Sequence, residues 1–297
     1  MRFILEDDST AEWARQTYHE TRTNGELTAT SHSPPISSQQ HNGVSLVRRA
    51  GEPRMNGTRV PHLEETPVTT QIVILAAGMG SRLGRSLPKP LTELSDGRTI
   101  MRQQFDNVHQ AFGRDVKVTI VVGYKLEHII EAFPHADFVY NEAYDQTNTS
   151  KSLLRALQAT KDAPVLWMNG DVVFDPEALV RAGDLVARDQ SFVSVNTAKV
   201  SDEEVKYTTD ETGHIRELSK TVRGGLGEAV GINFVSSRDK AALVRQLQRV
   251  DAQDYFERGI ELAIEHDGVR FQPVDISDLY AVEIDFAEDL ERANAFV

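Results

Sequence analysis

The stretch Gln71–Leu91 reads QIVILAAGMGSRLGRSLPKPL and decides the fold. Its first part, Ile72–Ala77, is an apolar run that suits a buried strand and is too short to span a membrane. Glycines directly after such a strand allow a tight turn that brings backbone N–H groups up to an anion. Cations follow in a chain that is otherwise strongly acidic, so the stretch predicts a polyphosphate-binding loop. The glycines are Gly78 and Gly80, and the cations are Arg82, Arg85 and Lys89.

Two better-known glycine motifs do not fit this loop. The P-loop pattern G-x-x-x-x-G-K-[ST] requires a Gly-Lys pair, and the chain contains none. The dinucleotide pattern G-x-G-x-x-G requires a third glycine where Leu83 stands, and Gly84 comes one residue late. The loop is therefore neither a P-loop nor a dinucleotide fingerprint.

The stretch resembles the signature L-A-A-G-x-G-x-R-L, then P-K-P-L, of the nucleotidyltransferase family that includes sugar-phosphate and choline-phosphate enzymes. A strand with an ordinary basic loop is the alternative, but a match of this length is hard to obtain by accident. The matching positions are Leu75, Ala76, Ala77, Gly78, Gly80, Arg82, Leu83, Pro88, Lys89, Pro90 and Leu91. The nucleotide-binding residues that the resemblance implies here are Leu75, Ala76, Ala77, Gly78, Met79, Gly80, Ser81, Arg82 and Lys89.

Composition limits the classes of partner. The 297 residues suffice for two average domains or for one α/β domain with a tail. A net charge of −13 argues against nucleic acid and against an anionic membrane, but it permits a small anionic substrate in a locally basic cleft. The absence of cysteine excludes disulfides and thiolate metal sites. The N-terminus MRFILEDD does not have the pattern of a signal peptide, so we expect a cytoplasmic protein.

Residues 1–70 differ from the rest and are predicted to form a partly flexible N-terminal extension. Thr21–Thr69 is rich in small and polar residues and lacks periodicity. Before it, Ser9–Arg22 predicts a short helix with Ser9 and Glu12 in capping-box spacing. A helix that can dock makes a homodimer a reasonable expectation, and a disordered leader without a role is the alternative.

Residues 71–297 are predicted to form the nucleotidyltransferase domain. Strand patterns alternate with helical patterns up to Thr197, which predicts an α/β fold with a mostly parallel sheet and helices on both faces. The family resemblance implies a Rossmann-like, GT-A-like version of this fold. The predicted strands are Ile72–Ala77, Val116–Val122, Phe138–Tyr140, Pro164–Met168 and Phe192–Thr197. The predicted helices are Thr99–Phe112, Leu126–Phe133, Thr147–Thr160 and Ala178–Ala187.

The remainder predicts a small β-hairpin subdomain on the acceptor side and a closing segment. The hairpin combines Val205–Thr209 with His214–Leu218 across a good turn sequence. Arg270–Val274 and Leu279–Ile284 are predicted to pair with each other as strands. Further predicted elements are a strand at Ala229–Val235, helices at Arg238–Val250 and Tyr255–His266, and a helix from Phe286.

The stretch TNTSKSLL, from Thr147, resembles the T-N-N-x-x-S-L of the choline-phosphate and phosphonate cytidylyltransferase branch, with Thr149 in place of the second Asn. Thr147 is predicted to be the N-cap of the following helix. Asn148 and Ser152 are predicted to contact the base or ribose of the nucleotide. Helix capping alone is the alternative explanation for Thr147 and Asn148.

Two further stretches carry carboxylates that the family uses for its metal. Asp171 in NGDVVF follows a buried strand, and a carboxylate there is costly without a cation. The resemblance assigns Mg²⁺ to Asp171 and to Asp285, which lies in EIDFAEDL. A helix-capping role for Asp171 is the alternative, although Asp175 fills that role better. Phe286 stands where the family usually has Thr.

Four residues are predicted to bind the acceptor on weaker grounds. The family places a lysine near the acceptor phosphate and an acid near its cationic end, which gives Lys220 and Glu228 these roles. Tyr255 and Tyr280 are predicted to line the acceptor pocket. A solvated lysine, a strand-edge glutamate and tyrosines in the core are equally acceptable explanations.

The resemblance implies a Mg²⁺-dependent cytidylyltransferase that transfers CMP from CTP to phosphocholine or to a phosphonate such as 2-aminoethylphosphonate, and releases pyrophosphate. The catalytic residues implied are Lys89, Arg82, Asp171 and Asp285. A sugar-1-phosphate or inositol-1-phosphate nucleotidyltransferase is the alternative enzyme. A non-catalytic nucleotide-sensing regulator is the alternative from another class. It would be expected to have lost one of these residues, and none is missing.

Overall fold

The computed structural model describes a defined part of the chain, all of it within one of the two units into which the chain divides. The predicted helix Ser9–Arg22 and almost all of the extension 1–70 lie outside the described residues. The described residues are 2–3, 69–80, 83, 86–160, 162–198, 200–201 and 204–297.

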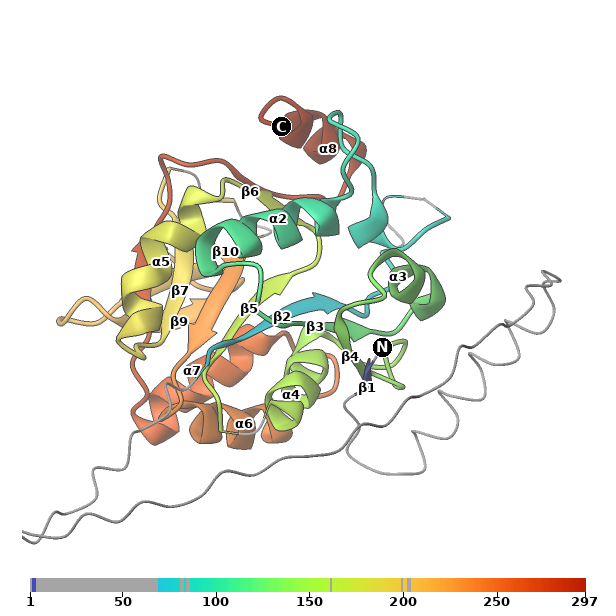
Figure 1. The fold of residues 1–297 in the computed structure, drawn as a ribbon. Coiled ribbons are helices and arrows are strands. Elements are labelled where there is room, and N and C mark those ends of the chain that lie inside the picture. The colour runs from blue at the N-terminus through green and yellow to red at the C-terminus, as the bar shows by residue number, and fades with distance from the viewer. Residues whose placement is uncertain are drawn as a thin grey trace, which may run out of the picture. The chain divides into compact units, whose positions relative to one another are not determined.

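A ten-stranded sheet forms the centre of the described residues, with the strand order β1-β4-β3-β2-β5-β10-β7-β11 and the hairpin β8–β9 attached through β10 (Figure 1). The run from β1 to β5 is parallel, and β10 is antiparallel to both of its neighbours β5 and β7. This confirms the predicted α/β fold with a mostly parallel sheet. The strands of this sheet are β1 (Arg2–Phe3), β2 (Gln71–Ala76), β3 (Val118–Val122), β4 (Asp137–Tyr140), β5 (Val165–Asn169), β7 (Phe192–Asn196), β8 (Lys206–Thr209), β9 (Ile215–Ser219), β10 (Gly227–Val235) and β11 (Gln272–Asp275).

Helices cover both faces of this sheet because its central strands are apolar on both sides. In β2, Ile72 and Ile74 face one hydrophobic core, and Val73 and Leu75 face another. Helices α2, α3 and α5 pack on the first face, and α4, α6 and α7 pack on the second (Figure 1). The helices are α2 (Ile100–Phe112), α3 (Leu126–Ala132), α4 (Thr149–Ala159), α5 (Glu177–Ala187), α6 (Lys240–Arg249), α7 (Phe256–Asp267) and α8 (Ala287–Asn294).

The predicted pairing of Arg270–Val274 with Leu279–Ile284 is wrong. Strand β11 joins the central sheet and runs parallel to β7. Strand β12 (Ala281–Glu283) instead forms a separate antiparallel ribbon with β6 (Val172–Phe174). Short strands carry little information about their partner, because a run of three or four residues fits either edge equally well. The ribbon brings the end of the chain beside the turn that follows β5.

The predicted hairpin is present at β8 and β9, and its turn has the expected chemistry. Gly213 has a φ of +83°, and the N–H of Asp210 donates to the carbonyl of His214 at 2.8 Å. The hairpin continues the sheet through the antiparallel pair β8–β10. No helix among the described residues combines the length and the apolar character that crossing a bilayer requires.

Candidate active site

The glycine loop leaves the sheet at the carboxyl end of β2, the edge where parallel sheets bind their ligands. The side chains of residues 75–77 are buried, so this part of the chain presents only its backbone to a ligand. Gly78 and Met79 are exposed, and Gly80 has a φ of +57°. A β-carbon on Gly80 would lie 3.0 Å from Cβ of Lys89, so the loop packs tightly against that lysine. Ser81 and Arg82, which were also predicted to bind the nucleotide, lie outside the described residues.

Lys89 begins the short 3-10 turn η2 (Lys89–Leu91) directly after Pro88. Its Nζ donates hydrogen bonds to Oδ2 of Asp171 at 2.8 Å and to Oδ1 of Asp285 at 2.6 Å. Burial alone lowers the pKa of Lys89, but the two carboxylates more than offset this effect and raise that pKa above its usual value. Three of the four residues predicted to be catalytic therefore meet at one ammonium group.

The ribbon β6–β12 brings the two aspartates together. Asp171 directly precedes β6, and Asp285 follows the end of β12. Glu283 lies opposite Val172 in the ladder, and the N–H of Ile284 donates to the carbonyl of Asp171 at 3.0 Å. The strand-end position that the sequence predicted for both carboxylates is correct, but the ribbon that joins them was not foreseen.

Glu283 is a third acid at this site, and its role was not recognised from the sequence. One carboxylate oxygen from each of Asp171, Glu283 and Asp285 lies within 4.8 Å of the others. The charge of Asp171 and burial raise the pKa of Glu283 well above its usual value, and Lys89 opposes this effect only in part. The signal was the spacing in Glu-Ile-Asp, because side chains two positions apart point to the same side of an extended chain.

We call these three acids the acidic cluster, and its two aspartates alone carry more negative charge than one lysine neutralises. Oδ1 of Asp171 is buried and has no hydrogen-bond partner among the described residues. A buried carboxylate oxygen without a partner is costly unless a cation meets it. Carboxylate oxygens are the ligands that hard divalent cations prefer. The acidic cluster therefore fits a divalent metal ion.

Helix α2 fixes the backbone on both sides of Asp171. Nε2 of Gln104 donates to the carbonyl of Asn169 at 2.7 Å and to that of Val172 at 2.8 Å. Gln103 donates to the carbonyl that ends β6 at 2.6 Å. These bonds satisfy backbone groups that are buried beside the acidic cluster, and they hold Asp171 on rigid elements rather than on a free loop.

The model of the MobA-like NTP transferase domain matches residues 72–228, which is more than half of the chain. The chain belongs to this family. The matched range contains the glycine loop, Lys89 and Asp171, and it ends before β12 and Asp285. The nucleotidyltransferase resemblance that the sequence motifs indicated is thus confirmed.

Two curated relatives are similar to this chain. The CMP-5'-(3-aminopropyl)phosphonate synthase of Streptomyces rubellomurinus is 29% identical over 255 residues, which cover 76% of this chain and 38% of the synthase. The bifunctional protein GlmU of Cupriavidus pinatubonensis is 29% identical over 181 residues, which cover 61% of this chain and 36% of that protein. The chain thus spans less than half the length of both relatives.

Two solved structures share the fold of this chain. The CTP:phosphocholine cytidylyltransferase LicC from Streptococcus pneumoniae has a TM-score of 0.61 at 16% identity, covering 77% of this chain and 99% of LicC. The inositol-1-phosphate CTP transferase from T. maritima has a TM-score of 0.62 at 16% identity, covering 77% of this chain and 98% of that chain. At this level of identity the likeness concerns the fold alone.

The N-terminus of α4 differs from the prediction in one respect. The N-cap is Asn148 and not Thr147, because the Asn148 side chain accepts from the N–H of Thr149 at 2.8 Å. Thr147 Oγ1 donates to a carbonyl one turn back at 2.7 Å. Asn148 also donates to the carbonyl of Gln253, and Ser152 is nearly buried and accepts from an asparagine side chain. The polar groups of Asn148 and Ser152 are thus engaged within the protein, and nucleotide contact by them stays a prediction.

The acceptor candidates divide into two pairs. Lys220 Nζ lies 5.0 Å from the ring centre of Tyr255, whose side chain is well exposed. Glu228 instead accepts from the backbone N–H of Ser201. Tyr280 stacks on Phe296 with ring centres 4.9 Å apart, within the hydrophobic cluster under α8. The structure therefore brings Lys220 and Tyr255 together, whereas Glu228 and Tyr280 contact other parts of the chain.

Glu257 is an acid beside this pair that sequence reasoning missed. It occupies the first turn of α7 and is almost fully buried. Its Oε2 has no hydrogen-bond partner among the described residues. Burial raises its pKa to about 7, although its own N–H and the charge of Lys220 act in the opposite direction. No sequence signal distinguishes it, because an acid in the first turn of a helix is expected on dipole grounds alone.

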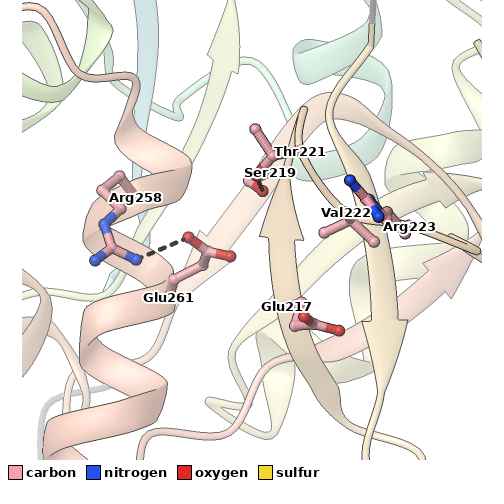
Figure 2. Close-up of a pocket in the computed structure, with 7 residues that line it drawn as sticks. All are labelled: Glu217, Ser219, Thr221, Val222, Arg223, Arg258 and Glu261. Carbon is pink, nitrogen blue, oxygen red and sulfur yellow. Dashed lines mark hydrogen bonds and ion pairs between the residues drawn. The ribbon is translucent and has the colours of Figure 1, made fainter. Parts of the chain in front are cut away.

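A cavity of about 440 Å³ lies between β9, the segment that follows it and α7 (Figure 2). Within it, Nη1 of Arg258 lies 3.1 Å from Oε2 of Glu261, and Oε1 of Glu261 accepts from the N–H of Leu218. The cavity does not include the acidic cluster. Two of its lining residues, Ser219 and Thr221, are the sequence neighbours of Lys220. The lining residues are Glu217, Ser219, Thr221, Val222, Arg223, Arg258 and Glu261.

Proposed function

We propose that this protein is a Mg²⁺-dependent cytidylyltransferase that transfers CMP from CTP to a small phosphate- or phosphonate-bearing acceptor. The observation that carries the proposal is the position of Lys89, whose ammonium lies between Asp171 and Asp285 and whose Cβ packs against Gly80 of the glycine loop. A cation and carboxylates at the carboxyl end of a parallel sheet are the parts that nucleotidyl transfer requires. The family supports this reaction class.

The reaction is an in-line displacement at phosphorus. An anionic oxygen of the acceptor forms a bond to the α-phosphorus of CTP, the bond from that phosphorus to the oxygen bridging to the β-phosphate breaks, and pyrophosphate leaves with the electron pair. The acceptor group is already ionised at neutral pH, so no general base is needed. The protein has to overcome repulsion between two anions and stabilise the charge that develops at phosphorus.

Each part of the site has a role in this scheme. Lys89 lies where it can stabilise the charge on the α-phosphate, and the N–H groups around Gly78 and Gly80 bind the outer phosphates together with Arg82. Asp171 and Asp285 would hold Mg²⁺, which when bound screens the charges of the two reacting anions. Gln104 keeps Asp171 in position through the neighbouring carbonyls.

Three observations favour CTP and an aminoalkyl acceptor. The stretches TNTSKSLL and EIDFAEDL resemble the cytidylyltransferase branch. One relative, whose alignment covers 76% of this chain, is named as a CMP-5'-(3-aminopropyl)phosphonate synthase. The exposed ring of Tyr255 already holds the ammonium of Lys220 at 5.0 Å, so it offers a face that suits an acceptor with a cationic end.

The sugar-1-phosphate or inositol-1-phosphate nucleotidyltransferase is the second candidate, because the signature of the glycine loop resembles that of a family that also includes sugar-phosphate enzymes. It shares Lys89, Asp171 and Asp285 with the first candidate, so these residues do not separate the two. The two differ in the acceptor that they use, and a substrate panel distinguishes them.

The test is pyrophosphate release with Mg²⁺ across CTP, UTP, ATP, GTP and dTTP. The acceptors are phosphocholine, 2-aminoethylphosphonate, 3-aminopropylphosphonate, glucose-1-phosphate and inositol-1-phosphate. We expect turnover with CTP and an aminoalkyl acceptor, and turnover about 10²- to 10³-fold lower in Lys89→Ala, which controls for contaminating enzymes. Turnover with UTP or dTTP and a sugar phosphate would contradict the proposal and support the second candidate.

A further inference from the structure

The loop that follows β3 packs tightly against the glycine loop. Strands β2 and β3 are parallel neighbours with Ala76 opposite Val122, so their two loops leave the same edge of the sheet side by side (Figure 1). The N–H of Tyr124 donates to the carbonyl of Ala77 at 3.0 Å. A β-carbon on Gly123 would lie 2.6 Å from that same carbonyl oxygen, so only glycine allows this contact.

Lys125 stands in this second loop in an unusual backbone conformation. Its φ of 48° and ψ of 43° lie in the left-handed region, which is unfavourable for any residue with a β-carbon. Glycine, asparagine and aspartate are the usual occupants of such a position. Lys125 is also the N-cap of α3, yet its side chain makes no capping bond. The backbone position therefore does not explain why a lysine is there, and its side chain must provide the reason.

The Lys125 ammonium reaches across to the glycine loop. Nζ donates to the carbonyl of Ser86 at 2.5 Å and lies 5.3 Å from the ring centre of Tyr124. A carbonyl accepts one of the three ammonium N–H groups and does not neutralise the charge. In the part of the chain that the structure describes, no carboxylate forms an ion pair with Lys125. The Lys125–Ser86 contact is exposed, so an anion in the loop can reach the ammonium.

We propose that Lys125 is a further binding residue for the β- and γ-phosphates of the nucleotide and for the pyrophosphate product. The inference rests on the proposed function, because it takes the glycine loop to hold a triphosphate. In the nucleotide-free protein, the ammonium is held over the loop by the Ser86 carbonyl and by the ring of Tyr124. A phosphate oxygen is a stronger partner than a neutral carbonyl for the same donor. Lys125 thereby adds a cation to the glycine loop, and this cation comes from the loop that follows β3.

The test is calorimetric binding of pyrophosphate, CTP and CMP to the full chain in the presence of Mg²⁺. We expect Lys125→Gln to weaken pyrophosphate and CTP about tenfold or more, and to leave CMP unchanged, since CMP lacks the outer phosphates. Glutamine can still donate to a carbonyl, so this variant removes the charge while keeping a hydrogen-bond donor. Lys125→Arg should retain most of the affinity.

Lys117→Gln is the matched control. Lys117 is exposed just before the opposite end of β3, so its replacement removes the same charge far from the loop and should leave all three affinities unchanged. The difference between wild type and Lys125→Gln should also shrink as salt is raised, because the lost interaction is electrostatic. A purely structural role for Lys125 would not show this salt dependence.

Lys125→Asn tests the same proposal with a residue that suits the left-handed backbone. We expect it to be at least as stable as wild type and to lose pyrophosphate binding as Lys125→Gln does. Wild-type affinity for pyrophosphate in either variant, or an equal loss for CMP and CTP, overturns the role of Lys125. A wild-type protein that binds neither CTP nor pyrophosphate overturns the proposed function as well.

Discussion

The ammonium of Lys89 lies 2.6 Å from Oδ1 of Asp285, although 196 positions separate the two residues in the sequence. The contact is largely buried, because the side chain of Lys89 is 10% exposed and that of Asp285 is 20% exposed. Removing one partner of such a pair leaves the other without compensation. Substitution of either residue should therefore affect both binding and turnover.

Lys89→Ala should reduce turnover about 10²- to 10³-fold, the usual effect of losing one group that stabilises developing charge. The same variant should bind Mn²⁺ more tightly than wild type, because the ammonium no longer competes for the oxygens of Asp171 and Asp285. Turnover is measured as pyrophosphate release in quenched time-course assays. Mn²⁺ affinity is measured by electron paramagnetic resonance of free Mn²⁺. Lys117→Ala is the control for loss of a surface charge. Near wild-type turnover in Lys89→Ala would remove the lysine from the mechanism.

Asp171→Asn should weaken Mn²⁺ binding about tenfold or more and reduce turnover at least as strongly as Lys89→Ala. The amide keeps the size of the side chain but supplies a weaker ligand to a divalent cation. The control is Asp184→Asn, since the Asp184 side chain on α5 is 85% exposed. Unchanged Mn²⁺ affinity in Asp171→Asn would show that the acidic cluster does not hold the metal.

Glu257→Gln should stabilise the fold at pH 8 and have little effect at pH 4. The pKa of Glu257 is raised from 4.5 to about 7 in the folded protein, so the folded state binds a proton that the unfolded state has lost between these values. Wild-type stability should therefore decrease, relative to the variant, as pH rises from 4.5 to 7, and level off above that. The full difference is of the order of 3 kcal/mol.

Urea unfolding of both proteins across this pH range measures the effect. Glu265→Gln is the control, because Glu265 lies on the same helix and is exposed. A difference between wild type and Glu257→Gln that stays constant with pH would mean that the side chain acts through packing and not through its charge.

Gly123→Ala should destabilise the fold by about 1–3 kcal/mol, because the added methyl group meets both a carbonyl oxygen and the Tyr144 side chain at 2.6 Å. Gly183→Ala in α5 is the opposite case, since the added β-carbon would meet nothing within 4 Å apart from its chain neighbours and the backbone of its own helix. There alanine should stabilise by up to about 1 kcal/mol through helix propensity. Thermal unfolding of the two variants should thus shift in opposite directions from wild type.

The sequence predicted the parts of the site that depend on local pattern. The apolar run before Gly78 indicated β2, and the carboxylates at strand ends indicated Asp171 and Asp285, because period and position are local properties. Partner choice for three-residue strands is a tertiary property, so the β6–β12 ribbon and the third acid Glu283 were missed. The burial of Glu257 depends on how α7 packs, and no local pattern reports that. The left-handed backbone conformation of Lys125 could not be predicted from the sequence for the same reason.

The ribbon between β6 and β12 has a consequence for recombining this domain with its relatives. Asp171 and Asp285 flank two strands, β6 and β12, that pair with each other, yet the matched family range contains only Asp171 and β6. A chimaera with a crossover between residues 228 and 281 would join half of a ribbon from each parent, and the register of the ladder would then decide whether the carboxylates meet. The backbone N–H of Ser95 donates to Oδ1 of Asn294 in α8 at 2.8 Å, so the C-terminal helix is also held by a contact with the first half of the domain. Chimaeras in which β6, β12 and α8 all come from the same parent should remain functional. Hybrids with a single crossover between residues 228 and 281 should fail.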